Sequence, residues 1–119
     1  MSYESNVALM INKNDYETLK NKFQKLDKYC QEWLKNAEKR GHLSFGNEKE
    51  NNEHTYLYWD DEKWDEHLPE VKEVMDLTRT LEKENRTYDY IRIGDNENDI
   101  EHRYKNDQCF EVKRTINKF

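Results

Sequence analysis

A change in the spacing of apolar residues near position 12 constrains the fold of this chain more than any other feature. Residues 7–11 form a continuous apolar run between two asparagines, which is typical of a short strand buried on both faces. From residue 14 onward the apolar positions recur at alternating intervals of three and four, as on one face of a helix. We therefore expect one long amphipathic helix that ends near Arg40, with Gly41 terminating it. Its apolar face consists of Tyr16, Leu19, Phe23, Leu26, Cys30, Trp33 and Ala37.

The same repeat also occurs in coiled coils, so two interpretations of this helix are open. Coiled-coil seams favour Leu and Ile, whereas this face mixes aromatic residues with Cys30 and Ala37. We therefore favour a helix that packs across a sheet within the same chain.

The middle of the chain predicts a loop, a strand and a second helix. Residues 41–53 are mostly polar and are expected to form a mobile loop. Apolar alternation at 55–59 is typical of a strand. Pro69 suits the first turn of a helix, and an apolar stripe follows it up to about Glu84.

The last third predicts three short strands, at 88–93, 100–105 and 110–116, joined by links short enough for antiparallel hairpins. The element order is then β-α-β-α-β-β-β. This order predicts an α+β fold in which a single layer of two helices packs on an antiparallel or mixed sheet. The length fits a single domain over 1–119.

The composition indicates a core with few aliphatic side chains. Leu, Ile, Val and Phe together number only 22 of 119 residues, so 8 Tyr and 3 Trp have to supply much of the buried area. No apolar run is long enough for a membrane span and no signal peptide is recognisable, so we expect a soluble, cytoplasmic protein without a membrane partner. Cys30 and Cys109 lack the spacing of a zinc motif, which predicts reduced thiols in or near the core and no cofactor.

Acidic residues concentrate in the segment 45–84, which holds 13 acidic and 5 basic side chains. Within it, strand alternation sends Tyr56 and Tyr58 to the face opposite Leu57 and Trp59, so some rings are expected at the surface beside carboxylates. Aromatic rings flanked by acids are typical of an interface with a basic partner protein. The predicted partner-binding residues are the anchors Tyr56, Tyr58 and Trp64 and the carboxylates of Asp60, Asp61, Glu62, Asp65 and Glu66. In the alternative interpretation Trp59 and Trp64 are core residues and the acids solvate a turn.

Two weaker patterns concern metal chemistry. Asp95, Glu97 and Asp99 could offer oxygen ligands to calcium, but the glycine and distal glutamate of an EF-hand loop are missing, so a polar hairpin loop is favoured. Asp99 with Glu111 and Lys113 matches the acid and Glu-x-Lys arrangement of one nuclease superfamily, and a small metal-dependent nuclease is the enzyme alternative. We expect no enzyme, because the sequence carries no specific catalytic motif. Direct nucleic-acid binding is disfavoured by the net charge of -6.

Several motifs carry a resemblance to known proteins. They are Trp59-Asp60-x-x-Lys63-Trp64, Pro69-Glu70-Val71, Tyr90-Ile91-Arg92-Ile93-Gly94-Asp95 and Asp99-Ile100-Glu101. In this pattern the chain resembles small proteins encoded by phages and prophages of low-GC bacteria. Small acidic phage proteins of this kind are similar to anti-defence inhibitors, which implies binding to a host immune effector with a basic surface. An antitoxin or immunity protein and a DNA mimic remain as alternatives.

Overall fold

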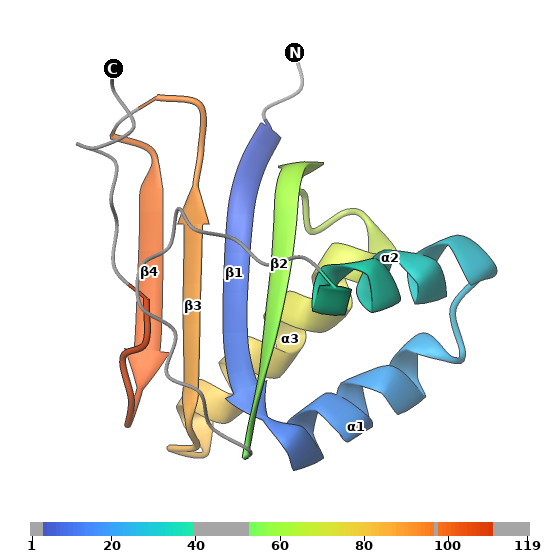
Figure 1. Cartoon of the computed structure of the whole chain (residues 1–119), viewed down its shortest axis with the longest axis horizontal. Helices are drawn as coiled ribbons and strands as arrows, with labels where there is room; N and C mark the ends of the chain where they lie inside the picture. Colours follow the sequence, from blue (N-terminus) through green and yellow to red (C-terminus); the bar gives the residue numbers. More distant parts are fainter. Residues whose placement is uncertain (1–3, 40–52, 97, 111–119) are drawn as a thin grey trace.

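The computed structural model describes residues 4–39, 53–96 and 98–110, which form three helices and an antiparallel sheet of four strands. The strand order is β2-β1-β3-β4, so β1 and β3 are the central strands (Figure 1). The α+β class is confirmed, but the described residues hold three helices where two were predicted. In chain order the elements are β1 (Glu4–Asn12), α1 (Lys13–Phe23), α2 (Lys28–Lys39), β2 (His54–Lys63), α3 (Pro69–Lys83), β3 (Tyr88–Ile93) and β4 (Ile100–Lys105).

Two predicted elements fall largely outside the described residues. Of the expected loop at 41–53 the structure describes only Glu53, and of the expected strand at 110–116 it describes only Phe110. The hairpin predicted between β3 and β4 is confirmed by antiparallel pairing, in which Tyr88 lies opposite Lys105.

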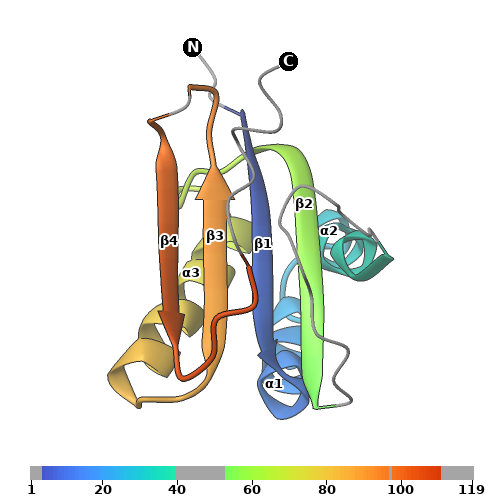
Figure 2. The same cartoon turned by 60° about the vertical axis from the view of Figure 1, so that its left-hand side comes forward.

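The central strand β1 is buried on both faces, as its apolar run predicted. Val7, Leu9 and Ile11 face the helices and join the larger core cluster, which also contains the buried side chains of all three helices. Ala8 and Met10 face the other way and join a smaller cluster with Cys109 and Phe110. Figure 2 shows the segment after β4 turning back over the sheet on the side away from the helices. A strand covered on both faces needs apolar residues at every position, which explains the run without alternation.

The long helix predicted over 14–40 is interrupted, and this prediction was wrong. α1 ends at Phe23 and α2 begins at Lys28 after a short turn, and Figure 1 shows α2 turning back above α1. The Asp27 side chain caps α2, since its Oδ1 accepts a hydrogen bond of 2.9 Å from the Cys30 N–H. Leu26 in the turn is partly buried against the same core, so the apolar spacing continues through the break. Both helices pack within this core, which excludes the coiled-coil interpretation for the described part of the chain.

Aromatic rings fill the space between the helices and β2. Trp33 of α2 stacks on Trp59 of β2 with ring centroids 4.9 Å apart and on Trp64 at 5.8 Å. Phe23 of α1 is parallel to Trp33 on another side, at 6.1 Å. The Trp33 indole also donates a hydrogen bond of 2.8 Å to Glu62. Large stacked rings bury enough area to offset the small number of aliphatic residues.

Stability is expected to fall at alkaline pH, because burial holds several weak acids in their neutral form. Burial raises the pKa of the Cys30 thiol to about 12 and, with a hydrogen bond to Glu82, that of Tyr88 to about 12. The pKa values of Tyr16 and Tyr90 are also raised, chiefly by burial. The unfolded chain releases these protons at lower pH than the folded chain does, so this stabilisation is complete below about pH 9 and is lost as the pH rises towards 12. Urea unfolding at a series of pH values would test this, and an unchanged free energy of unfolding between about pH 9 and 11 would contradict it.

Candidate partner-binding site

The acidic segment begins at a β-bulge on the edge strand β2. Among the described residues β2 pairs with β1, and the register between the two strands shifts so that Asp60 and Asp61 together face Asn6. Asp61 has a φ of 51°, a left-handed conformation that Asp tolerates better than most residues, and its N–H donates to Asn6 Oδ1 at 2.9 Å. A bulge redirects the side chains of the strand that carries it, and here it turns the Asp61 side chain out to solvent.

Tyr58 is not a surface anchor, and this part of the predicted site was wrong. Alternation places Tyr56 and Tyr58 on the face away from the helices, as predicted, but Tyr58 is only 2% exposed. Both rings meet Phe110 edge-on, with centroids 6.3 Å from it, and Tyr56 is half-buried. The segment after β4 therefore covers this face of β2.

Trp64 lies partly in the core. Its ring is half-buried and packs against Trp33 and Trp59, which corrects the prediction of an exposed anchor in favour of the alternative interpretation. Its remaining surface lines a pocket between the β2–α3 connection and the β3–β4 hairpin.

Three of the predicted carboxylates hold the local chain in place. Glu62 accepts the indole hydrogen of Trp33. Asp65 Oδ1 accepts a hydrogen bond of 2.9 Å from the His67 N–H and lies 2.8 Å from its ring nitrogen, and these bonds lower the pKa of Asp65. Glu66 forms an ion pair with Arg79 of α3. The acids therefore keep a fixed negative charge at this end of the molecule.

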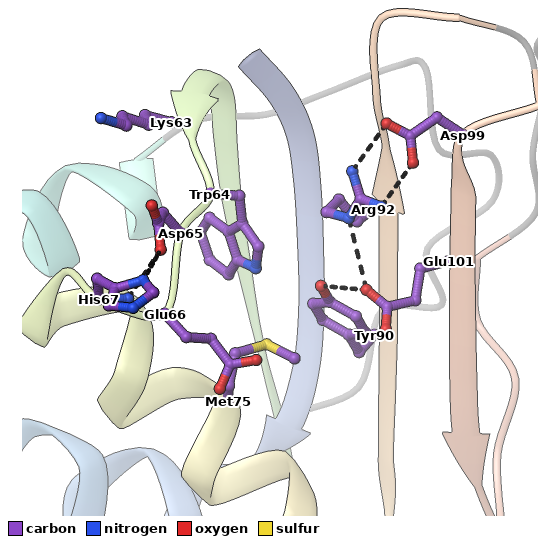
Figure 3. Close-up of a pocket in the computed structure, with 10 residues that line it drawn as sticks. All are labelled: Lys63, Trp64, Asp65, Glu66, His67, Met75, Tyr90, Arg92, Asp99 and Glu101. Carbon is purple, nitrogen blue, oxygen red and sulfur yellow. Dashed lines mark hydrogen bonds and ion pairs between the residues drawn. The ribbon is translucent and has the colours of Figure 1, made fainter. Parts of the chain in front are cut away.

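A pocket of about 500 Å³ adjoins this acidic segment (Figure 3). One wall is the connection from β2 to α3, and the other is formed by side chains of the β3–β4 hairpin. The structure brings Trp64, Asp65 and Glu66 of the predicted set together on the first wall, beside Lys63 and His67. Tyr56 and Tyr58 belong to the opposite face of the sheet.

The second wall is a hydrogen-bonded network centred on Arg92 of β3. Its guanidinium donates to both oxygens of Asp99, at 2.7 and 3.2 Å, and to Ser5 Oγ at 3.1 Å. Glu101 accepts a hydrogen bond of 3.1 Å from the Tyr90 hydroxyl and lies 3.4 Å from Arg92 Nε. Arg92 is thus paired with Asp99 and Glu101 within the wall. Glu101 also lies 3.8 Å from Arg103 Nε, and its carboxylate lines the pocket.

No protein-family model matches this sequence, and neither curated proteins nor solved structures give a significant match. In the described ranges no helix is long and apolar enough to cross a membrane.

The calcium-loop and nuclease alternatives both use Asp99 as a metal ligand. In the structure the Asp99 carboxylate forms an ion pair with Arg92, which takes the place that a metal cation would need. The Asp99 backbone also closes the hairpin, since its carbonyl accepts the Gly94 N–H at 2.7 Å. Gly94 leaves room for the Asp99 carboxylate, because a Cβ atom at position 94 would lie 1.8 Å from Asp99 Oδ2 and would force that side chain to move. Glu97, Glu111 and Lys113 lie outside the described residues.

The Arg92 wall of the pocket was not predicted from the sequence as part of the site. Its charges pair across the hairpin, where Arg92 lies directly opposite Glu101. Counting strand positions backward and forward from the turn at Gly94 would have placed these opposite charges side by side.

Proposed function

We propose that this protein is a non-enzymatic inhibitor that binds a bacterial defence protein through the acidic end of its sheet. The docking surface comprises the exposed bulge residue Asp61 and the acidic pocket beside it. The observation that supports this most directly is the charge of the pocket lining, which contains Asp65, Glu66, Asp99 and Glu101. The lining holds two cations, Lys63 and Arg92, against these four carboxylates, so it is net negative even though Arg92 is paired with Asp99 and Glu66 is paired with Arg79 of α3. A surface of this kind favours a positively charged partner.

The pocket chemistry fits an arginine or lysine side chain from the partner. Trp64 and Met75 supply apolar surface that the methylene stem of such a side chain could contact. Glu66 and Glu101 would then meet the charged head, and an indole face adds cation–π attraction. Figure 3 shows Trp64 between the two groups of carboxylates, with Met75 beneath it. The pocket would therefore receive one basic side chain as the centre of a larger interface.

The resemblance to small phage proteins favours a defence protein as the partner, and an antitoxin or immunity role would use the same surface. DNA mimicry requires rows of carboxylates at near-phosphate spacing. Here Asp65, Glu66 and Glu62 are held instead by internal hydrogen bonds and an ion pair, which favours ordinary docking. Competition by duplex DNA for the captured partner would distinguish the two modes.

Neutralising the acidic surface is expected to abolish inhibition. The test variant combines Asp61→Asn, Asp65→Asn and Glu66→Gln, which keep the size of each side chain. Asn tolerates the left-handed backbone at 61 and can still accept the His67 N–H at 65, so folding is expected to be retained. The chain would be expressed in bacteria that carry an active defence system, and phage plaques counted. We expect the wild-type chain to restore plaque formation. With the triple variant the number of plaques should be at least about tenfold lower, because each lost charged contact costs about 1.4 kcal/mol or more of binding free energy.

A matched control removes three charges elsewhere, by Glu17→Gln, Glu53→Gln and Glu84→Gln, all at exposed positions. Affinity capture from the same cells should recover a partner with the wild type and the control but not with the triple variant. If all three chains capture the same proteins and protect phage equally, the acidic surface is not the interface.

A further inference from the structure

A second cluster of chemically reactive side chains lies at the other end of the sheet. It consists of His54, the first residue of β2, and of Asp107 and Cys109 in the segment after β4. One ligand atom from each residue lies within 4.8 Å of the others. The imidazole, carboxylate and thiol come from the two edges of the sheet and meet over its face.

The surroundings of the cluster are those of a binding site. His54 Nδ1 is buried and has no hydrogen-bond partner. Cys109 is 6% exposed and is not disulfide-bonded, while Asp107 is half-buried. A buried ring nitrogen without a partner is costly, and a cation bound at that nitrogen would compensate the cost.

The backbone on one side of the cluster is held firmly. Asp89 of β3, which is fully buried, accepts hydrogen bonds from the N–H groups of Cys109 at 2.6 Å and Phe110 at 2.9 Å. These bonds fix the Cys109 backbone against the sheet, within reach of His54. Preorganised ligands lower the entropic cost of metal binding.

We propose that His54, Asp107 and Cys109 bind a zinc ion, with water completing the coordination. Thiolate, imidazole and carboxylate are the ligands that zinc takes, whereas calcium and magnesium bind through oxygen alone. Tetrahedral zinc with bonds of 2.0–2.3 Å places its ligand atoms about 3.3–3.7 Å apart, so side-chain shifts of about 1 Å would close the site. Binding releases the thiol proton of Cys109 to solvent. The ion would tie β2 to the segment after β4.

The test uses Co²⁺ and Zn²⁺ added to the full chain after chelation and removal of the chelator. Cobalt bound to a thiolate gives a charge-transfer absorption band, and we expect this band to saturate at one equivalent and to disappear when zinc is added. Zinc in excess should also raise the melting temperature by about 5 °C or more, as expected for a ligand that binds the folded state at about one hundred times its Kd.

Paired variants identify the ligands. Cys109→Ser is expected to abolish the band and Cys30→Ser to retain it, because Cys30 is buried elsewhere and donates to Glu70. His54→Gln and Asp107→Asn, at partly exposed positions, should each weaken zinc binding at least tenfold, as metal-site changes commonly do. These two variants keep the proposal testable if Cys109→Ser fails to fold. His67→Gln, on an exposed side chain, serves as the histidine control.

A cobalt spectrum without a thiolate band would overturn the proposal, as would a band lost in Cys30→Ser but kept in Cys109→Ser. Unchanged affinity in both His54→Gln and Asp107→Asn would overturn it as well.

Discussion

Replacing Asp89 with Ala is expected to lower the free energy of unfolding by about 3–5 kcal/mol. The Asp89 carboxylate is fully buried on the central strand β3. One oxygen accepts two backbone N–H groups, from Cys109 and Phe110, and the other lies 2.8 Å from His102 Nε2. The Ala variant leaves these groups without their acceptor inside the protein, and each unsatisfied buried group carries its own desolvation cost.

Urea denaturation measures this effect, and hydrogen exchange locates it. Asp89→Asn keeps one acceptor oxygen and is expected to lose less stability than Asp89→Ala. Asp95→Ala, in the exposed β3–β4 turn, should change stability by no more than about 0.5 kcal/mol. We expect faster amide exchange at Cys109 and Phe110 in Asp89→Asn, before any change in α3. A loss below about 1 kcal/mol for Asp89→Ala would mean that this carboxylate does not anchor the segment after β4.

Trp59→Ala is expected to cost about 3–5 kcal/mol, as for other large aromatic residues in cores. Trp59 is 1% exposed, and its ring contacts that of Trp33, with centroids 4.9 Å apart, and that of Trp64, with centroids 5.2 Å apart. Removing its ring leaves a cavity between β2 and α2 and removes both ring contacts.

Chemical unfolding followed by circular dichroism tests this prediction without relying on tryptophan fluorescence. Tyr29→Ala is the matched control, because Tyr29 is an aromatic residue on α2 that is 65% exposed. It should change stability by no more than about 0.5 kcal/mol. If the two variants lose equal stability, the stacked tryptophans do not form the centre of the core.

The bounds of an element were predicted well where a glycine or a proline marks its beginning or its end. The strands at 88–93 and 100–105 were predicted with their exact bounds, because a turn that begins at Gly94 separates them. The helix after Pro69 was predicted within one residue of its end. The turn between α1 and α2 was missed, because Leu26 continues the apolar spacing and only the capping residue Asp27 marks the break.

The site was harder to predict, because it depends on contacts between distant segments. The position of the acidic residues follows from the sequence, and Trp64, Asp65 and Glu66 do line one pocket. The burial of Tyr58 does not follow, because Phe110 from the other end of the chain covers it. The proximity of His54 to Cys109 likewise arises from the turn of the chain after β4, which no spacing rule for zinc ligands would reveal.

The bulge at Asp61 has a consequence for how the molecule behaves in concentrated solution. An edge strand with a regular row of backbone hydrogen-bonding groups is a template for aggregation with another chain. At the end of β2 the pairing register shifts, and charged side chains at Asp60, Asp61 and Glu62 interrupt any continuous apolar edge. An incoming strand would meet mismatched hydrogen-bonding groups and negative charge there. The bulge therefore makes this end of β2 a poor place to add a fifth strand, which protects the edge of the sheet from self-association.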